Sequence, residues 1–105
     1  MKVTSFEFYK SQKVPTTIES KINSFLEGKA LKFASQNESP STGKVIITVF
    51  AEDTDKASPK IKCFRNSSAA KLAADVEEFL GTGAKLKFFT QSFSSNNITA
   101  ILFYE

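Results

Sequence analysis

The sequence has no histidine and no tryptophan, and Cys63 is its single cysteine among 105 residues. Without His, the commonest general base and the commonest metal-ligating side chain are missing. A lone Cys excludes an internal disulfide and is typical of a reducing compartment. As a nucleophile, Cys63 would have no imidazole to activate it. We therefore expect a non-enzymatic protein that needs no metal and no cofactor.

Long apolar runs, strong charge and arginine are also scarce. No stretch approaches the ~20 apolar residues that span a bilayer, and the N-terminus reads as a strand with an acid, not as a signal peptide. We therefore expect a cytoplasmic protein that does not bind membranes. The net charge is only +3, and Arg65 is the single arginine. Because bidentate recognition of guanine and phosphate favours Arg, the composition argues against a reader of duplex DNA.

The sequence is rich in phenylalanine, with eleven residues. It also contains an internal repeat. Phe25-Leu26 returns as Phe79-Leu80, Leu31-Lys32-Phe33 as Leu86-Lys87-Phe88, and Phe50-Ala51-Glu52 as Phe103-Tyr104-Glu105. One repeat is one supersecondary unit that cannot bury its apolar face alone. We expect a single domain, 1–105, made of the repeats 1–52 and 60–105 and joined by a linker at 53–59.

Each repeat is predicted to run strand-helix-strand-strand. In the first repeat we expect strands at 2–9, 30–36 and 44–51 and a helix at 15–27, with Pro15 at its first position. In the second repeat we expect strands at 60–65, 85–91 and 97–104 and a helix at 68–80. The predicted fold class is α+β, a two-layer sandwich with both helices on one face of a mostly antiparallel sheet.

Two of these strands, 44–51 and 97–104, are apolar on both sides. The sets around Ile47 and Ala100 are expected to face the helices. The opposite sides, together with a neighbouring aromatic, then give a predicted interface made of Ile46, Phe50, Phe89, Ile101 and Phe103. An apolar patch of this kind marks an interaction surface. Self-association through this face or through sheet edges, coverage by the chain's own N-terminal strand and loops, and a ligand groove all stay open.

The start of the second helix is the best candidate for a polar site. Arg65, Asn66, Ser67 and Lys71 would combine cationic side chains with free helix N–H groups, which attract anions. An ordinary Asn/Ser cap beside a solvated Arg is the alternative. Lys32 and Lys87 occupy equivalent positions in the two repeats and would form a symmetric basic pair, unless they are solvated strand lysines.

The second repeat resembles a known family. The strand Lys60–Phe64, the helix positions Leu72 and Val76 before Phe79-Leu80, and the final strand Ile98–Glu105 are similar to very small sporulation-associated proteins of spore-forming bacteria. The chain looks like two such units fused. The strand-helix-strand-strand order is also similar to that of dodecin, a flavin-binding assembly, although dodecin's flavin-stacking Trp is absent here.

The leading hypothesis is a non-enzymatic, homo-oligomeric binding protein that sequesters a small anionic, nucleotide-like ligand. Some virus-encoded anti-defence proteins of similar size do this, which is an analogy of style. One alternative is a protein-interaction or inhibitor module that acts through a sheet face or edge. Another is a single-stranded nucleic-acid binder in which phenylalanines stack on bases.

Overall fold

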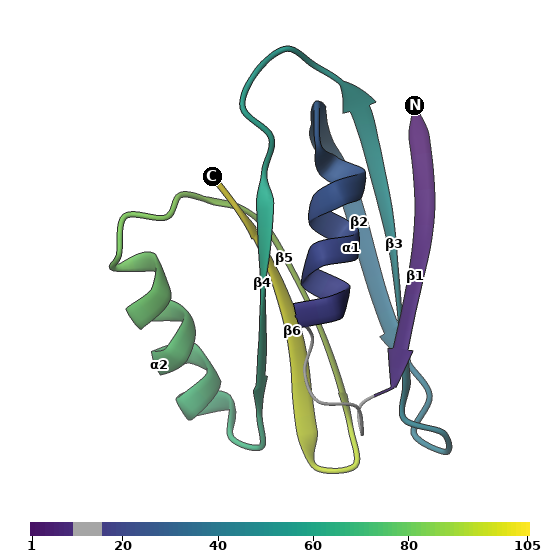
Figure 1. Cartoon of the computed structure of the whole chain (residues 1–105). Helices are drawn as coiled ribbons and strands as arrows, with labels where there is room; N and C mark the ends of the chain where they lie inside the picture. Colours follow the sequence, from purple (N-terminus) through teal and green to yellow (C-terminus); the bar gives the residue numbers. More distant parts are fainter. Residues whose placement is uncertain (10–15) are drawn as a thin grey trace.

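The computed structural model describes residues 1–9 and 16–105 (Figure 1). The first unit consists of β1 (Lys2–Tyr9), α1 (Thr16–Leu26), β2 (Lys29–Glu38) and β3 (Lys44–Asp53). The second unit consists of β4 (Lys60–Asn66), α2 (Ala69–Leu80), β5 (Leu86–Ser94) and β6 (Asn97–Tyr104). The predicted strand-helix-strand-strand repeat is therefore confirmed. Pro15, expected at the first helical position, lies outside the described residues.

The two hairpins are longer than the sequence patterns predicted. Strand β5 continues to Ser94 because the turn that follows needs only two residues, Ser95 and Asn96, with φ of 51° and 62°. Left-handed residues at both centres suit the twist of a two-residue hairpin. Three of the residues between the predicted strands 85–91 and 97–104, Ser92, Phe93 and Ser94, therefore belong to β5.

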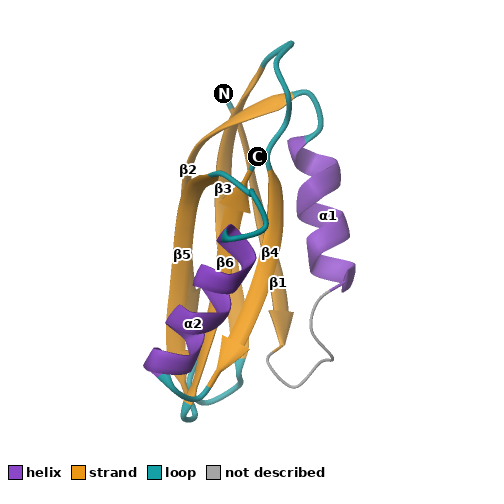
Figure 2. Ribbon diagram, turned by 90° about the vertical axis from the view of Figure 1, so that its left-hand side faces the viewer, coloured by secondary structure: helices purple, strands orange, loops and turns teal. Residues whose placement is uncertain are grey.

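The strands form two three-stranded antiparallel sheets, in the orders β1-β3-β2 and β4-β6-β5. This differs from the predicted single sheet with both helices on one face. Strands β2 and β5 lie side by side, but within the described part of the chain they are joined through side chains, without a backbone ladder. Each helix consequently packs on the sheet of its own unit, and β4 passes between the two helices (Figures 1 and 2).

Both hairpins carry the same irregularity. The register of β2 against β3 shifts between Leu31 and Phe33, and that of β5 against β6 shifts between Leu86 and Phe88. Lys32 and Lys87 are therefore the inserted residues of two equivalent β-bulges. A bulge bends its strand and strengthens the local twist, so the repeat preserves backbone shape as well as side-chain pattern.

Each sheet has a front face, which its own helix covers, and a back face on the other side. On β3 the front face carries Ile47 and Val49, and on β6 the back face carries Ile101 and Phe103. The core forms where the first unit's front face and α1 meet the second unit's back face. Its buried residues are Ile18, Ile22, Leu26, Ala34, Ile47, Val49, Ala51, Ile61, Cys63, Ile101 and Phe103. The two units therefore meet through different faces.

Helix α1 also covers the free edge of the second sheet. The side chain of Asn23 accepts a hydrogen bond of 2.9 Å from the backbone N–H of Ile61, and Glu19 accepts one of 2.8 Å from the N–H of Cys63. Unpaired backbone groups on an edge strand are a liability that a covering helix removes.

In the described part of the chain, neither helix combines the length and the apolar character that a membrane span requires.

Candidate functional site

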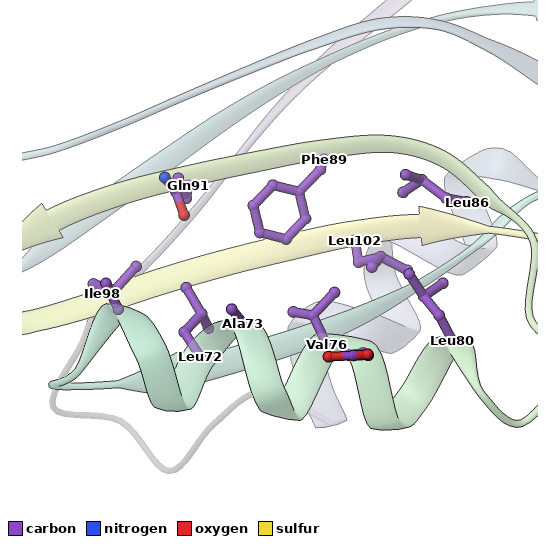
Figure 3. A pocket seen from close by; sticks show the side chains of 11 residues that line it. Leu72, Ala73, Val76, Leu80, Leu86, Phe89, Gln91, Ile98 and Leu102 are labelled. Atoms are coloured by element: carbon purple, nitrogen blue, oxygen red, sulfur yellow. The ribbon is translucent and has the colours of Figure 1, made fainter.

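A groove of about 630 Å³ lies beside α2, over the front faces of β5 and β6 (Figure 3). Its lining is mostly apolar and consists of Ala69, Leu72, Ala73, Val76, Glu77, Leu80, Leu86, Phe89, Gln91, Ile98 and Leu102. Pockets of this size with few, separated polar groups are typical binding sites. This groove is therefore the candidate functional site.

The groove stays open because α2 is anchored on one side of its sheet. The ring of Phe79 packs edge-on against Phe64 of β4, at 5.9 Å between ring centroids, and against Tyr104 of β6, at 4.9 Å. The helix thus lies towards β4. Leu86, on the opposite side of the groove, remains 54% exposed.

The equivalent space in the first unit is filled. Gln36, on the front face of β2, donates hydrogen bonds to the hydroxyl of Ser92 (2.8 Å) and to the carbonyl of Thr99 (2.9 Å). Its carbonyl accepts a hydrogen bond of 2.7 Å from the hydroxyl of Thr90. All three partners belong to the back face of the second unit. That back face therefore closes the first unit's groove.

Glu38 adds to the same polar seam. Its two carboxylate oxygens accept hydrogen bonds from the hydroxyls of Ser92 and Ser94. Phe33 contacts Phe88, with 5.7 Å between ring centroids, at the other end of the seam. The contacts advance together along both strands, so β2 and β5 run side by side in the same direction.

Exposed large apolar side chains are confined to two surfaces of the described molecule, apart from the terminal Met1. Four lie on the back face of the first unit: Val3 (53% exposed), Tyr9 (43%), Phe33 (51%) and Ile46 (42%). Two lie on the front face of the second unit: Leu86 (54%) and Phe93 (63%). These surfaces are the unpartnered ends of a two-unit stack.

The predicted interface is partly wrong. Ile101 and Phe103 have no exposed surface, because the first unit covers the back face of β6. Ile46 is exposed and Phe50 is half-buried against Phe33, so these two do lie on an open back face. Phe89 is half-buried in the groove, on a different surface. The second sheet therefore does not offer the open apolar back face that the sequence predicted.

The residues of the predicted anion site are not brought together. Arg65 pairs with Thr99 on the back face of its sheet, whereas α2 lies on the front face. Alternate residues of a strand point to opposite sides, so Arg65 and Asn66 diverge. The N–H of Lys71 is already capped by the hydroxyl of Ser68, at 3.3 Å.

The other two residues of that prediction have separate surroundings. The carbonyl oxygen of the Asn66 side chain accepts a hydrogen bond from the N–H of Ser68, and its amide donates one to Asp75. Ser67 is exposed and lines a hollow with Phe93. These contacts favour the ordinary Asn/Ser cap that the sequence left as the alternative.

Arg65 lies instead in a cleft of about 400 Å³ between the hairpin turns of the two units. The other lining residues are Pro40, Ser41, Thr42, Gly43, Ser95 and Asn97. The Nε atom of Arg65 and the hydroxyl of its cross-strand neighbour Thr99 are buried without a hydrogen-bond partner. Unsatisfied buried groups of this kind are rare and call for an explanation.

Lys32 and Lys87 line one shallow hollow of about 190 Å³. Each forms an ion pair with an acid: Lys32 with Glu52 of β3 at 3.6 Å, and Lys87 with Glu105, which follows β6, at 3.0 Å. The predicted symmetric pair is thus brought together, but as two equivalent ion pairs. Their positive charge is balanced locally.

Cys63 is a free, buried thiol in the core. Burial, reinforced by the Glu19 carboxylate, raises the pKa of this thiol to about 12 from its ordinary 9.0. The thiolate is the reactive form of cysteine, so Cys63 is unreactive at neutral pH. The Cys63 side chain does not line the groove beside α2, because it lies on the opposite face of the sheet.

Comparison with known proteins gives no relative: no protein-family model, no curated protein and no solved structure matches the chain.

Proposed function

We propose that this protein is a non-enzymatic protein-interaction module that binds through the groove beside α2. One observation carries the proposal. The first unit's groove is occupied by a protein surface, the back face of the second unit, while the second unit's corresponding groove is open. A surface with this construction is suited to a polypeptide partner.

The chemistry of the groove favours a polypeptide over a small anion. Its described lining residues include one carboxylate, Glu77, and no lysine or arginine. An anion would therefore meet no compensating charge there, and burying an unpaired charge is costly. Leu86, Phe89 and Leu80 instead provide apolar contact area, and Gln91 supplies one amide that can fix orientation.

Site-specific photo-crosslinking tests this proposal. The photoreactive analogue p-benzoyl-phenylalanine replaces Phe89 inside the groove, and in a control variant it replaces Glu78, an exposed residue on the other side of α2. In cells that produce the protein, the Phe89 position is expected to give discrete protein adducts that the Glu78 position does not give. Identical adduct patterns from the two positions, or no adduct at all, would contradict the proposal.

A small-anion site is a second candidate function, located at the Arg65 cleft. It is supported by the buried, unpartnered Arg65 Nε beside the hydroxyl-bearing turns of both hairpins. Calorimetry with a panel of nucleotides is expected to show binding that Arg65→Ala removes and Lys71→Ala leaves intact. Heats that are equal for both variants would remove this candidate.

We further propose that the protein works in the cytoplasm, where its free thiol would stay reduced. The similarity to sporulation-associated proteins and to dodecin remains a prediction based on the sequence alone.

A further inference from the structure

We infer that the groove beside α2 receives the back face of the first unit of a second copy, so that chains stack head to tail. This inference rests on the proposed function and names its partner. The surface that binds is the second unit's front face, and the surface that is bound is the back face of β1, β3 and β2.

The interface inside the chain is the template. There, the front face of one strand-helix-strand-strand unit packs against the back face of another, with β2 and β5 side by side. A two-unit stack of this type leaves one front face and one back face without a partner. In repeat proteins such terminal faces either carry polar caps or recruit a neighbour.

Both terminal faces mix polar with apolar residues: the back face carries the ion pair of Lys44 with Glu7, and the front face carries Gln91. The exposed large apolar side chains gather on these two faces, with Ile46 and Phe33 on the back face and Leu86 and Phe93 on the front face. A front face and a back face are complementary in the template, where the contact of two back-face residues, Phe33 and Phe88, lies at the end of the seam. The observed pairing therefore favours a head-to-tail contact over a symmetric one.

Gln91 gives the docking its expected register. It is the equivalent of Gln36, which bonds the hydroxyls of Thr90 and Ser92 and the carbonyl of Thr99. The equivalents of these three partners on the first unit's back face are Ser35, Asn37 and Ile46. We therefore expect the Gln91 amide to bond the Ile46 carbonyl and the Ser35 and Asn37 side chains of the next chain.

The helix adds a second expected contact. Asn23 of α1 accepts a hydrogen bond from the N–H of Ile61 at the edge of the second sheet. The equivalent positions are Glu77 on α2, which lines the groove, and Val3 on β1. Glu77 is thus placed to accept a hydrogen bond from the Val3 N–H of the next chain. Such a heterologous contact produces rings when its rotation closes and filaments when it does not.

Two variants, each blocking one face, test the inference by sedimentation velocity. Leu86→Asp blocks the front face, and Ile46→Asp blocks the back face; both replace exposed strand residues. Ala74→Asp, on the exposed outer side of α2, is the matched control. We expect the wild type and Ala74→Asp to self-associate and each blocked variant alone to be monomeric. An equimolar mixture of the two blocked variants retains one good front face and one good back face, so it is expected to form a 1:1 dimer.

Circular dichroism checks that each variant is folded. If Leu86→Asp does not fold, Gln91→Arg replaces it on the front face, and if Ile46→Asp does not fold, Val3→Asp replaces it on the back face. A monomeric wild type at millimolar concentration would overturn the inference. So would self-association of either blocked variant alone, since it would indicate a symmetric contact. The proposed function fails separately: it is lost if Phe89 gives no specific adduct, and it survives without the inference if the adduct contains a different protein.

Discussion

Gln36 of β2 and Gln91 of β5 are equivalent residues of the two repeats, but only Gln36 is held in the core seam, where it bonds Thr90, Ser92 and the Thr99 carbonyl. Gln91 is exposed and lines the groove beside α2. The same residue type in the same local structure therefore closes one interface and stands open at the other.

This pair yields a matched prediction on stability. Gln36→Ala removes the hydrogen bonds to Thr90, Ser92 and the Thr99 carbonyl, and we expect it to lower the free energy of unfolding by about 1–3 kcal/mol. Gln91→Ala, at an exposed position, is expected to change it by less than about 0.5 kcal/mol. Urea unfolding at a concentration where the protein is monomeric measures both. Equal effects would contradict the role given to Gln36.

The buried back face of the second unit gives a second prediction. Phe103→Ala removes a side chain with no exposed surface, and cavity formation is expected to cost about 3–5 kcal/mol. Phe93→Ala is the control, because Phe93 is 63% exposed. Denaturant midpoints of the two variants are compared with that of the wild type. A small loss for Phe103→Ala would place this face outside the core.

A third prediction concerns how α1 covers the edge of β4. Asn23→Ala removes the acceptor of the Ile61 N–H, so we expect hydrogen exchange of this amide to accelerate about tenfold, the equivalent of ~1.4 kcal/mol. Ser24→Ala changes an exposed residue of the same helix and serves as the control. An Ile61 amide that exchanges at the same rate in Asn23→Ala and in the control would show that the helix does not protect the edge.

The buried thiol makes stability depend on pH on the alkaline side. The pKa of Cys63 is about 12 in the folded chain, raised from 9.0, so the unfolded chain loses its thiol proton first as pH rises. The contribution is complete below pH 9 and is lost between pH 9 and about 12, with a slope of at most ~1.4 kcal/mol per pH unit. Urea unfolding of the wild type at pH 8 to 11 is expected to show this loss relative to Cys63→Ala. Parallel pH profiles would contradict it.

The local structure of this protein could be read from its residues. The period of Ile18, Ile22 and Leu26 predicted the first helix, and the alternation around Ile47 predicted a strand with a buried side. These predictions succeed because spacing of 3.6 or 2 residues directly reports the face that is withdrawn from water. The repeated segments Leu31-Lys32-Phe33 and Leu86-Lys87-Phe88 form equivalent β-bulges. The residue pattern predicted the repeat but not the bulges.

The candidate site was found less completely. The repeat predicted the same environment for Phe50 and Phe103, because they occupy equivalent positions with similar neighbours. The structure buries Phe103 and leaves Phe50 half-buried on an open sheet face. The groove beside α2 was missed for a related reason: Leu86 and Leu80 match residues that a buried front face would also contain.

The sequence by itself determined the two strand-helix-strand-strand units and the apolar character of both sides of β3 and β6. Only the tertiary structure decided that the first unit's front face meets the second unit's back face, leaving one face of each kind open. The physical reason is that burial of apolar area has no direction of its own. Two nearly equivalent surfaces are distinguished only by long-range packing, through contacts such as those of Gln36 and Asn23 that bring distant parts of the chain together.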